Sequence, residues 1–259
     1  TVLNNMKIKH LLCFIALCLF FTPGKAQQLS VMTLRNGATV YIWEDKSKPD
    51  VFGMIAFKVG SVDDPEQYTG LAHYLEHVMF KGTQTIDALD WEKEKPIYEK
   101  IIAKYDERAA LSDPAAREAV DKEINDLTRE AAQYAAGNEF SLLVDHMGGQ
   151  GLNASTGYDQ TEYHNSFPPS QLEKWLEIYS ERLIDPVFRG FQTELEAVYE
   201  EYNMYNDDRG SRMREFIYEQ AFGDHPYARP IIGLPEHLKN PQLSKLIDFY
   251  NTWYGPQNM

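Results

Sequence analysis

The sequence predicts an α+β fold in which a mostly antiparallel sheet packs against helices. Short apolar runs separated by a turn signal stand near the beginning of the chain, and segments of helical periodicity follow them. Because strand patterns do not alternate regularly with helix patterns, a repeated βαβ array is not expected. A hydrophobic fraction of 43% over 259 residues supplies enough apolar side chains for a sizeable core.

The first 26 residues are predicted to be a secretory signal. Two lysines precede an apolar run over residues 11–21, and small residues up to Ala26 are typical of a cleavage site. A bilayer span needs roughly twenty apolar residues, so no stable membrane span is expected from this shorter run. The alternative is a buried amino-terminal helix. Residues 1–5 are interpreted as an upstream extension that precedes the natural start.

Cysteine usage and charge narrow the class of protein. Cys13 and Cys18 both lie in the predicted signal, so the exported chain would contain neither disulfides nor thiolate ligands. The signal indicates a periplasmic or cell-surface protein of a bacterium. The formal net charge is -14, and the signal contains lysines but no acid. A surface this acidic repels phosphate backbones, so a nucleic-acid partner is not expected.

The domain proper is expected to cover residues 27–259. It begins with a predicted β-hairpin, since two apolar runs flank the turn signal Asn36-Gly37. The expected strands are 29–34, 38–43 and 51–59, and the expected helices outside the inserted segment are 68–80, 170–183 and 193–206. The final residues, from Phe249 onward, are interpreted as the approach to another strand. The end at Met259 is therefore interpreted as a truncation of the domain.

Residues 85–137 differ in composition from their surroundings. They are rich in Glu, Lys, Ala and Asp, and their apolar residues recur at helical spacing on both sides of Ser112-Asp113-Pro114. That tripeptide is typical of a helix stop followed by a cap with Pro at the first helical position. We expect an inserted helical hairpin on the surface, with a structural role favoured over a role in recognition.

The central chemical signal is His73-Tyr74-Leu75-Glu76-His77. On a helix, positions i and i+4 share a face, so both imidazoles can reach one metal ion. Catalytic zinc uses three protein ligands and an open position for water, and a nearby carboxylate can take the proton of that water. The alternative is a pair of surface histidines on an amphipathic helix. Apolar neighbours on both sides disfavour it, because unpaired polar groups in a buried helix are costly.

A third ligand is expected from an acidic helix further along the chain. Glu194 and Glu201 are seven residues apart, which places them within about 20° of one another on a helix. Ala197 and Val198 lie on or near the same face and could pack inward. Inward carboxylates on a partly apolar helix indicate a cation. Judged by spacing alone, a solvated acidic helix fits equally well.

The block from Gly70 to Thr83 resembles, nearly residue for residue, the zinc-helix block of the insulinase-like (pitrilysin, inverzincin) metallopeptidases. The resemblance covers most of residues 29–259, and the inserted hairpin is similar to one found in a large exported bacterial subgroup. It implies one half of a clamshell fold and a Zn²⁺ cofactor. It also implies a homologous second half, in the same chain or in a separate subunit.

The resemblance also implies residue roles. By the family's pattern, His73, His77 and Glu201 would be the zinc ligands, Glu76 the general base, and Glu194 the supporting acid beneath the metal. Asn153 and Ala154 resemble the family's edge strand, where a peptide substrate adds by main-chain hydrogen bonds. A turn between strands is the local alternative for that segment.

The expected function is zinc-dependent endopeptidase action on unfolded peptides or extended protein segments. Two other classes stay open. One is a non-catalytic peptide-binding or scaffolding relative that needs a partner half, and the other is a metal-storage or sensing module. Scaffolding relatives tend to lose the metal motif, which is complete here, and storage modules usually cluster more histidines or cysteines.

Overall fold

The computed structural model describes residues 29–259, so the predicted signal and the interpretation of residues 1–5 lie outside the described residues. Within these bounds the chain divides into two compact units. The first contains residues 29–34 and 39–48, and the second contains residues 35–38 and 49–259.

The first unit is the expected β-hairpin. Strand β1 (Leu29–Thr33) pairs antiparallel with β2 (Thr39–Trp43), and Val31 stands opposite Tyr41. The chain reverses through the Asn-Gly turn, where Gly37 has a φ of 95°. Glycine adopts this left-handed conformation without steric cost, which explains the residue type at the turn.

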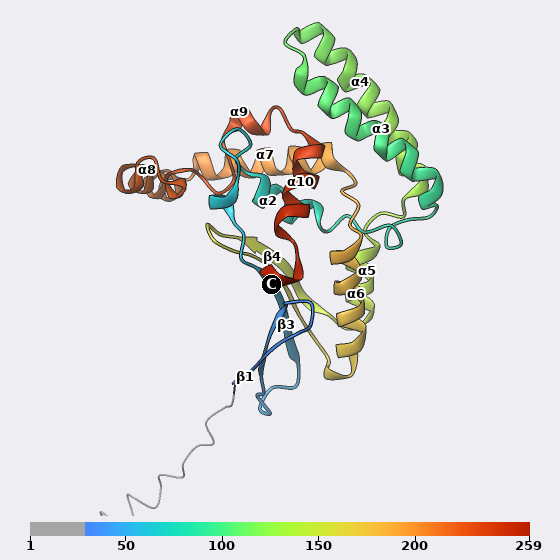
Figure 1. Ribbon diagram of the computed structural model, residues 1–259, viewed down its shortest axis with the longest axis vertical. Helices are drawn as coiled ribbons and strands as arrows, with labels where there is room; N and C mark the ends of the chain where they lie inside the picture. Colours follow the sequence, from blue (N-terminus) through green and yellow to red (C-terminus); the bar gives the residue numbers. More distant parts are fainter. Residues whose placement is uncertain (1–28) are drawn as a thin grey trace, which may run out of the picture. The chain divides into compact units, whose positions relative to one another are not determined.

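The second unit contains a three-stranded antiparallel sheet with the order β3-β5-β4 (Figure 1). Its strands are β3 (Val51–Phe57), β4 (Gln150–Thr156) and β5 (Thr161–Phe167). β3 ends two residues before the expected strand. The central strand β5 buries every second residue, which is the period-2 pattern of a strand with one face in a core.

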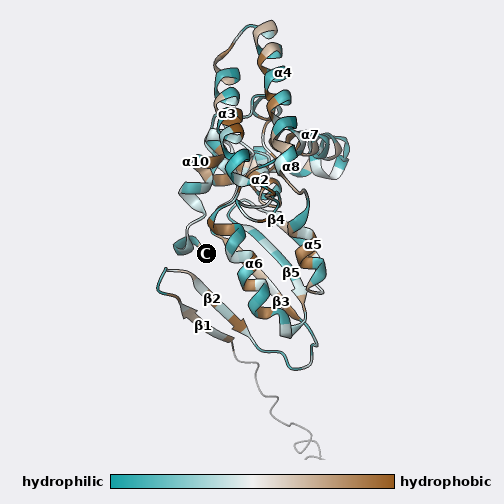
Figure 2. Ribbon diagram, turned by 90° about the vertical axis from the view of Figure 1, so that its right-hand side faces the viewer, coloured by the Kyte–Doolittle hydropathy of each residue, from teal (hydrophilic) through white to brown (hydrophobic). Residues whose placement is uncertain are grey.

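Two helices cover one face of this sheet, α5 (Glu139–His146) and α6 (Leu172–Ile184) (Figures 1 and 2). Trp175 and Tyr179 of α6 both donate hydrogen bonds to the Oδ1 atom of the buried Asn165, at 2.8 and 2.7 Å. A Cβ atom at position 53 would lie 2.6 Å from the Trp175 ring, so only glycine lets the helix approach β3 this closely.

The inserted segment folds as two antiparallel helices, α3 (Trp91–Ala110) and α4 (Pro114–Ala131). The start of α4 follows the expectation, because Asp113 accepts the N–H of Ala116 and Pro114 occupies the first helical position. α3 packs along helix α10 (Leu243–Trp253). The buried apolar side chains of the hairpin come from the predicted helical pattern: Ile97, Ile101, Tyr105, Val120 and Ile124.

The remaining helices are α2 (Leu71–Val78), α7 (Phe191–Asp207), α8 (Arg209–Phe222), α9 (Pro235–Leu238) and α10 (Leu243–Trp253). Short 3-10 turns lie at Ser61–Asp63, Ala132–Tyr134, Pro169–Gln171, Pro226–Ala228 and Pro256–Asn258. The interpretation of the final residues as the approach to another strand stays a prediction, since that strand would follow Met259. The final residues themselves are helical through Trp253, because Phe249 of α10 packs into the core at helical spacing with Leu246.

The α+β prediction is confirmed, since antiparallel strands and segregated helices make up the described chain. Across residues 29–259, none of the helices combines the length and the apolar character that a membrane crossing requires.

The start of α2 is held by a buried carboxylate. Asp64 is 4% exposed, and its two oxygens accept the N–H groups of Gly70 at 2.7 Å and Ala72 at 2.9 Å. These N–H groups have no partner within the helix, so Asp64 satisfies donors that every helix start leaves free. Burial raises the pKa of Asp64 to about 7, although the two hydrogen bonds and the nearby Arg229 oppose the rise.

We therefore predict that Asp64 makes stability depend on pH. The folded carboxyl keeps its proton up to about pH 7, whereas an unfolded aspartate releases it near pH ~3.9. In between, the folded state binds more protons, so the free energy of unfolding falls as pH rises from about 4 to about 7. The side chain of Asp64→Asn cannot titrate. Between about pH 4 and pH 7, the free energy of unfolding of this variant should therefore fall less than that of the parent, by on the order of 3 kcal/mol.

The measurement is urea unfolding of the metal-free chain across this pH range. Asp50→Asn, a change at an exposed position, is the control and should follow the parent. Parallel profiles for the parent and Asp64→Asn would show that the carboxyl is ionised throughout.

Candidate metal centre

Helix α2 carries the two histidines and the glutamate of the HxxEH motif. His73 and His77 lie one turn apart on the same face, with ring centroids 4.9 Å from each other. His73 and Glu76 are each only 9% exposed. The motif is therefore part of a buried helix, as its apolar neighbours in the sequence indicated, and the alternative of two surface histidines is not what the structure contains.

Helix α7 supplies the two acidic side chains. Its apolar face is buried against the core through Phe191, Leu195 and Val198, and the Phe191 ring lies 4.8 Å from the ring of Tyr74 on α2. This packing turns Glu194 and Glu201 toward the histidines, with side chains 15% and 25% exposed.

One detail of the helix prediction was wrong. Ala197 is exposed, whereas Val198 is fully buried as expected. Leu195 takes the inward position instead, because the buried stripe runs through residues 191, 195 and 198 at spacings of four and three. Glu196 and Glu200 are exposed.

Three donor atoms converge between α2 and α7. Glu201 Oε2 lies 3.6 Å from His73 Nε2 and 3.4 Å from His77 Nε2, and the three atoms all lie within 4.8 Å of one another. A tetrahedral zinc ion with bonds of about 2.0–2.1 Å separates its ligands by about 3.3 Å. The separations and the donor types therefore fit a zinc ion with three protein ligands.

The protonation states of the two imidazoles differ because their surroundings differ. Burial, together with the neighbouring His77, lowers the pKa of His73 to about 4, so its ring is neutral at physiological pH. Burial acts in the same direction on His77, but hydrogen bonds with Glu194 and Glu201 outweigh it and raise the pKa to about 9. The two carboxylates thus stabilise a positive charge at this point, and a bound cation would supply such a charge as well as a protonated imidazole does.

Glu194 orients His77 from the side opposite the donor cluster. Its Oε2 atom lies 3.5 Å from His77 Nδ1, while the Nε2 atom of the same ring faces Glu201. A carboxylate on one ring nitrogen fixes the tautomer that leaves the other nitrogen free to bind a metal. Burial would raise the pKa of Glu194, but hydrogen bonds with His77 and Lys81 lower it, so the carboxylate is charged.

Glu76 lies beside the cluster and is held by the sheet. Its Oε2 atom accepts a hydrogen bond of 2.6 Å from Thr156 at the end of β4. Burial raises the pKa of Glu76, although the Thr156 hydrogen bond and the nearby His77 oppose the rise. A carboxyl group with a raised pKa is suited to accept and release a proton near neutral pH.

A buried arginine lies behind the centre. Arg182 is fully buried, and its guanidinium lies 4.2 Å from the ring of Phe80 and 4.3 Å from the ring of Tyr163. Its Nε donates to the carbonyl of Met79 at 2.9 Å, one residue beyond α2. The positive charge of Arg182 favours the ionised form of Glu76, and its hydrogen bond to Met79 holds the end of α2.

The centre opens into a cavity of about 400 Å³. His73, Glu76 and Glu201 form part of its wall, and α8 forms another part. Ala154 lines the cavity, while Asn153 is exposed on the same strand. This segment is strand β4 rather than a turn, and in the part of the chain that the structure describes β4 pairs only with β5, so its other edge is free.

Three contacts to the site were not anticipated from the sequence: those of Lys81, Thr156 and Tyr205. Tyr205 hydrogen-bonds Glu201, and its spacing of four residues on α7 could have indicated this contact. Lys81 is likewise four residues beyond His77, although α2 ends before it. Nothing in the local pattern links Thr156 to Glu76, because the two residues meet only through the packing of β4 on α2.

The family described as Insulinase (Peptidase family M16) matches residues 39–95 and 124–234. The matched ranges leave out residues 96–123, which belong to the helical hairpin of α3 and α4.

Among curated relatives, an uncharacterised zinc protease of Mycobacterium leprae is 26% identical over 203 residues, which cover 78% of this chain and 34% of that protein. The zinc protease PqqE of Helicobacter pylori is 25% identical over 231 residues, covering 88% of this chain and 41% of that protein. The chain therefore spans less than half the length of these relatives.

Solved structures show the same fold. A protease from Helicobacter pylori superposes with a TM-score of 0.67 at 22% identity and covers 90% of this chain and 45% of that one. The first half of the periplasmic protease PqqL from Escherichia coli superposes with a TM-score of 0.65 at 23% identity, covering 90% of this chain and 42% of that one.

We predict that the three converging donors bind one zinc ion. The parent chain should retain about one zinc per chain after dialysis. Glu201→Gln should lose most of this zinc, because a neutral amide replaces a charged donor. Loss of an outer hydrogen-bond partner lowers metal affinity by roughly 10- to 100-fold, and loss of a direct ligand should lower the zinc affinity by more than that. Elemental analysis and competition with a chelator measure both quantities.

Glu200→Gln is the matched control, since it removes the same charge from an exposed position one residue earlier. Its zinc content should equal that of the parent. Equal loss in both variants would mean that general acidity, and not a defined site, attracts the metal.

Proposed function

The chain belongs to the insulinase family of peptidases (family M16), and from this premise we propose that it carries the zinc centre of an endopeptidase that hydrolyses unfolded peptides or extended protein segments. One observation carries the proposal. Two imidazole nitrogens and a carboxylate oxygen converge at zinc-ligand separations, and a second carboxylate stands beside them at the wall of an open cavity.

In this proposal His73, His77 and Glu201 hold the zinc ion. When bound, the ion would supply Lewis acidity and lower the pKa of a water molecule. Glu76 is the general base, which accepts a proton from the attacking water and passes it to the leaving amine. Thr156 keeps the Glu76 carboxylate in place through its hydrogen bond, so the base faces the cavity instead of rotating away.

The free edge of β4 is the proposed docking site for the peptide. An extended peptide can add to such an edge through main-chain hydrogen bonds, which gives affinity with little sequence preference. Asn153 and Ala154 lie on this edge, and Ala154 shares the cavity with the proposed zinc ligands. A peptide bound along β4 would therefore pass beside Glu76.

A homologous second half is a proposed partner, in the same polypeptide or in another subunit. The chain covers 45% of the Helicobacter pylori protease and 42% of the PqqL half-structure, so much of each neighbour has no counterpart in the described residues. Export to a bacterial periplasm or cell surface is likewise a proposal, supported by the signal-like first 26 residues and by PqqL, which is described as periplasmic.

We propose that residues 27–259 form one zinc-binding peptidase domain, truncated at its carboxyl end, that carries an insertion at 85–137. The unmatched stretch 96–123 supports the insertion, because the family pattern resumes on its far side.

A second candidate function is that of a non-catalytic peptide-binding or scaffolding relative. The free edge of β4 would serve such a protein equally well. The presence of Glu76 beside three metal donors favours catalysis, because peptide binding alone requires no buried carboxylate next to a metal-ligand group. A metal-storage module is disfavoured, since the described residues contain one metal-ligand group and storage requires several.

We predict that Glu76→Gln abolishes hydrolysis while zinc stays bound. The amide still accepts the Thr156 hydrogen bond but cannot take a proton, so kcat should fall by about 10²- to 10⁴-fold. The assay is cleavage of an unstructured, fluorescence-quenched peptide, with zinc content measured on the same samples.

Glu200→Gln serves as the control and should retain parental activity. If the zinc-loaded parent, assayed together with its second half, binds the peptide but cleaves it no faster than Glu76→Gln in the same assembly, the scaffolding function is the correct one. If Glu76→Gln cleaves as fast as an active parent, another group is the base.

A further inference from the structure

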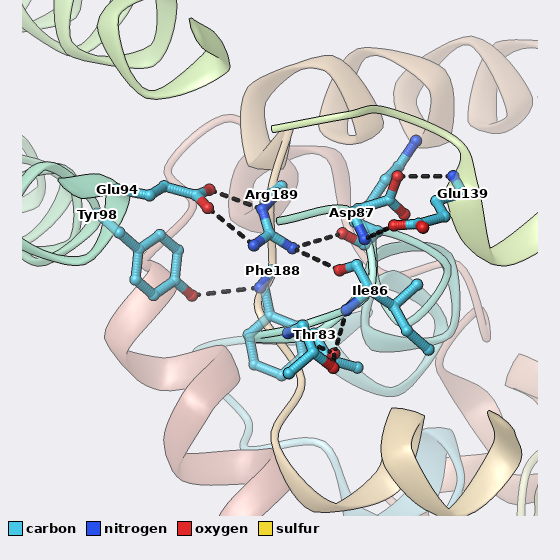
Figure 3. A network of polar contacts seen from close by, with 10 residues as sticks. Thr83, Ile86, Asp87, Glu94, Tyr98, Glu139, Phe188 and Arg189 are labelled. Carbon is cyan, nitrogen blue, oxygen red and sulfur yellow. Dashed lines mark hydrogen bonds and ion pairs between the residues drawn. The ribbon is translucent and has the colours of Figure 1, made fainter. Parts of the chain in front are cut away.

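The inserted hairpin contacts the segments that hold the candidate metal centre. Helix α3 places Glu94 against Arg189, which lies just before α7. Arg189 Nε and Nη2 donate to the two carboxylate oxygens of Glu94 at 2.6 and 2.8 Å (Figure 3). The Glu94 and Arg189 side chains are 2% and 11% exposed, so this is a buried bidentate ion pair. Such a pair fixes geometry, because breaking it leaves an uncompensated charge.

The same guanidinium also holds the chain that leaves α2. Arg189 Nη1 donates to the carbonyl oxygens of Lys81 at 3.2 Å and Ile86 at 3.4 Å. One turn further along α3, the hydroxyl of Tyr98 accepts the N–H of Phe188 at 3.3 Å (Figure 3). One helix of the insertion thus fastens the segment after α2 and the segment before α7.

Lys81 continues this chain of contacts to the metal centre. While its carbonyl is held by Arg189, its ammonium lies 2.5 Å from Glu194 Oε1. The other oxygen of Glu194 lies 3.5 Å from His77 Nδ1. The carboxylate is therefore engaged at both oxygens, which stops it from rotating away from the imidazole.

The orientation of His77 depends on that carboxylate. The ring must direct Nε2 toward Glu201 to complete the donor cluster, and Glu194 fixes the opposite nitrogen. Glu194 on its own could turn toward solvent, since its side chain retains some exposure. Lys81 supplies both the charge and the hydrogen bond that hold it inward.

We propose that Lys81 and Glu94 are positioning residues of the metal centre, and that the inserted hairpin thereby fixes the relative placement of the two metal-bearing helices. The inference rests on the proposed zinc site and deepens it. It assigns the insertion a role inside the peptidase domain, where composition alone indicated a solvated addition.

The test uses the full chain and measures zinc affinity, the absorption spectrum of the cobalt-substituted protein, and the melting temperature of the metal-free protein. In Lys81→Met, zinc should bind about 10- to 100-fold more weakly, as expected when a ligand loses its outer support. The visible bands of bound cobalt should shift, and the metal-free melting temperature should stay that of the parent. Lys81→Arg should restore affinity to within a few-fold, because it keeps the charge and a donor.

Glu94→Gln tests the contribution of the hairpin. It removes the charge that holds Arg189 while leaving one acceptor, and it should weaken zinc binding in the same direction as Lys81→Met. Lys93→Met is the control, since this lysine is exposed on the same helix and contacts Asp90 and the ring of Tyr134. It should match the parent in all three measurements.

The outcomes separate this inference from the proposed function. A parent that binds no zinc would overturn the metal centre itself and this inference with it. A zinc-binding parent with parental affinity and cobalt spectrum in Lys81→Met would overturn only the role of Lys81. A Glu94→Gln variant that melts earlier but binds zinc like the parent would show that the hairpin has a purely structural role. If Glu94→Gln does not fold, the two Lys81 variants decide the proposal.

Discussion

The packing of α2 against α7 is the interaction on which the candidate metal centre depends. Tyr74 packs its ring on Phe191 and donates its hydroxyl to the carbonyl of the same residue, while Val198 is completely buried beneath. Burial of these apolar side chains contributes roughly 1.5–3 kcal/mol each. That gain offsets the cost of placing two imidazoles and two carboxylates between the helices. Without this apolar burial, hydration of the polar groups would be more favourable than their contacts with one another.

The polar groups of the interface are arranged so that few remain uncompensated. Glu194 bridges a lysine and a histidine, Glu76 accepts from Thr156, and Glu201 faces two imidazoles. Within residues 29–259 the exception nearest the centre is His73, whose Nδ1 atom is buried without a hydrogen-bond partner. With Nδ1 protonated, the opposite nitrogen Nε2 is free to bind a metal ion, since a neutral imidazole is the form that binds metals.

Long-range contacts connect segments that are far apart in the sequence. More than a hundred residues separate the end of α2 from the start of α7, and closing such a loop has an entropic cost. The intervening chain folds into the hairpin, β4, β5 and the helices on the sheet, so it is itself ordered. Arg189 then ties the hairpin to both flanking segments through Glu94 and Lys81. The hairpin thus contacts both segments that flank it in space.

The sequence alone determined what depends on local geometry. His73 and His77 share a face because of the pitch of a helix, and Asp113-Pro114 begins α4 because its side chain and ring suit a helix start. Family resemblance supplied the roles, which spacing could not. Only the tertiary structure decided between an inward and a solvated Glu194, placed Lys81 and Thr156 at the centre, and made the final residues helical. Those outcomes depend on which apolar faces meet, and periodicity along one segment carries no information about its partner.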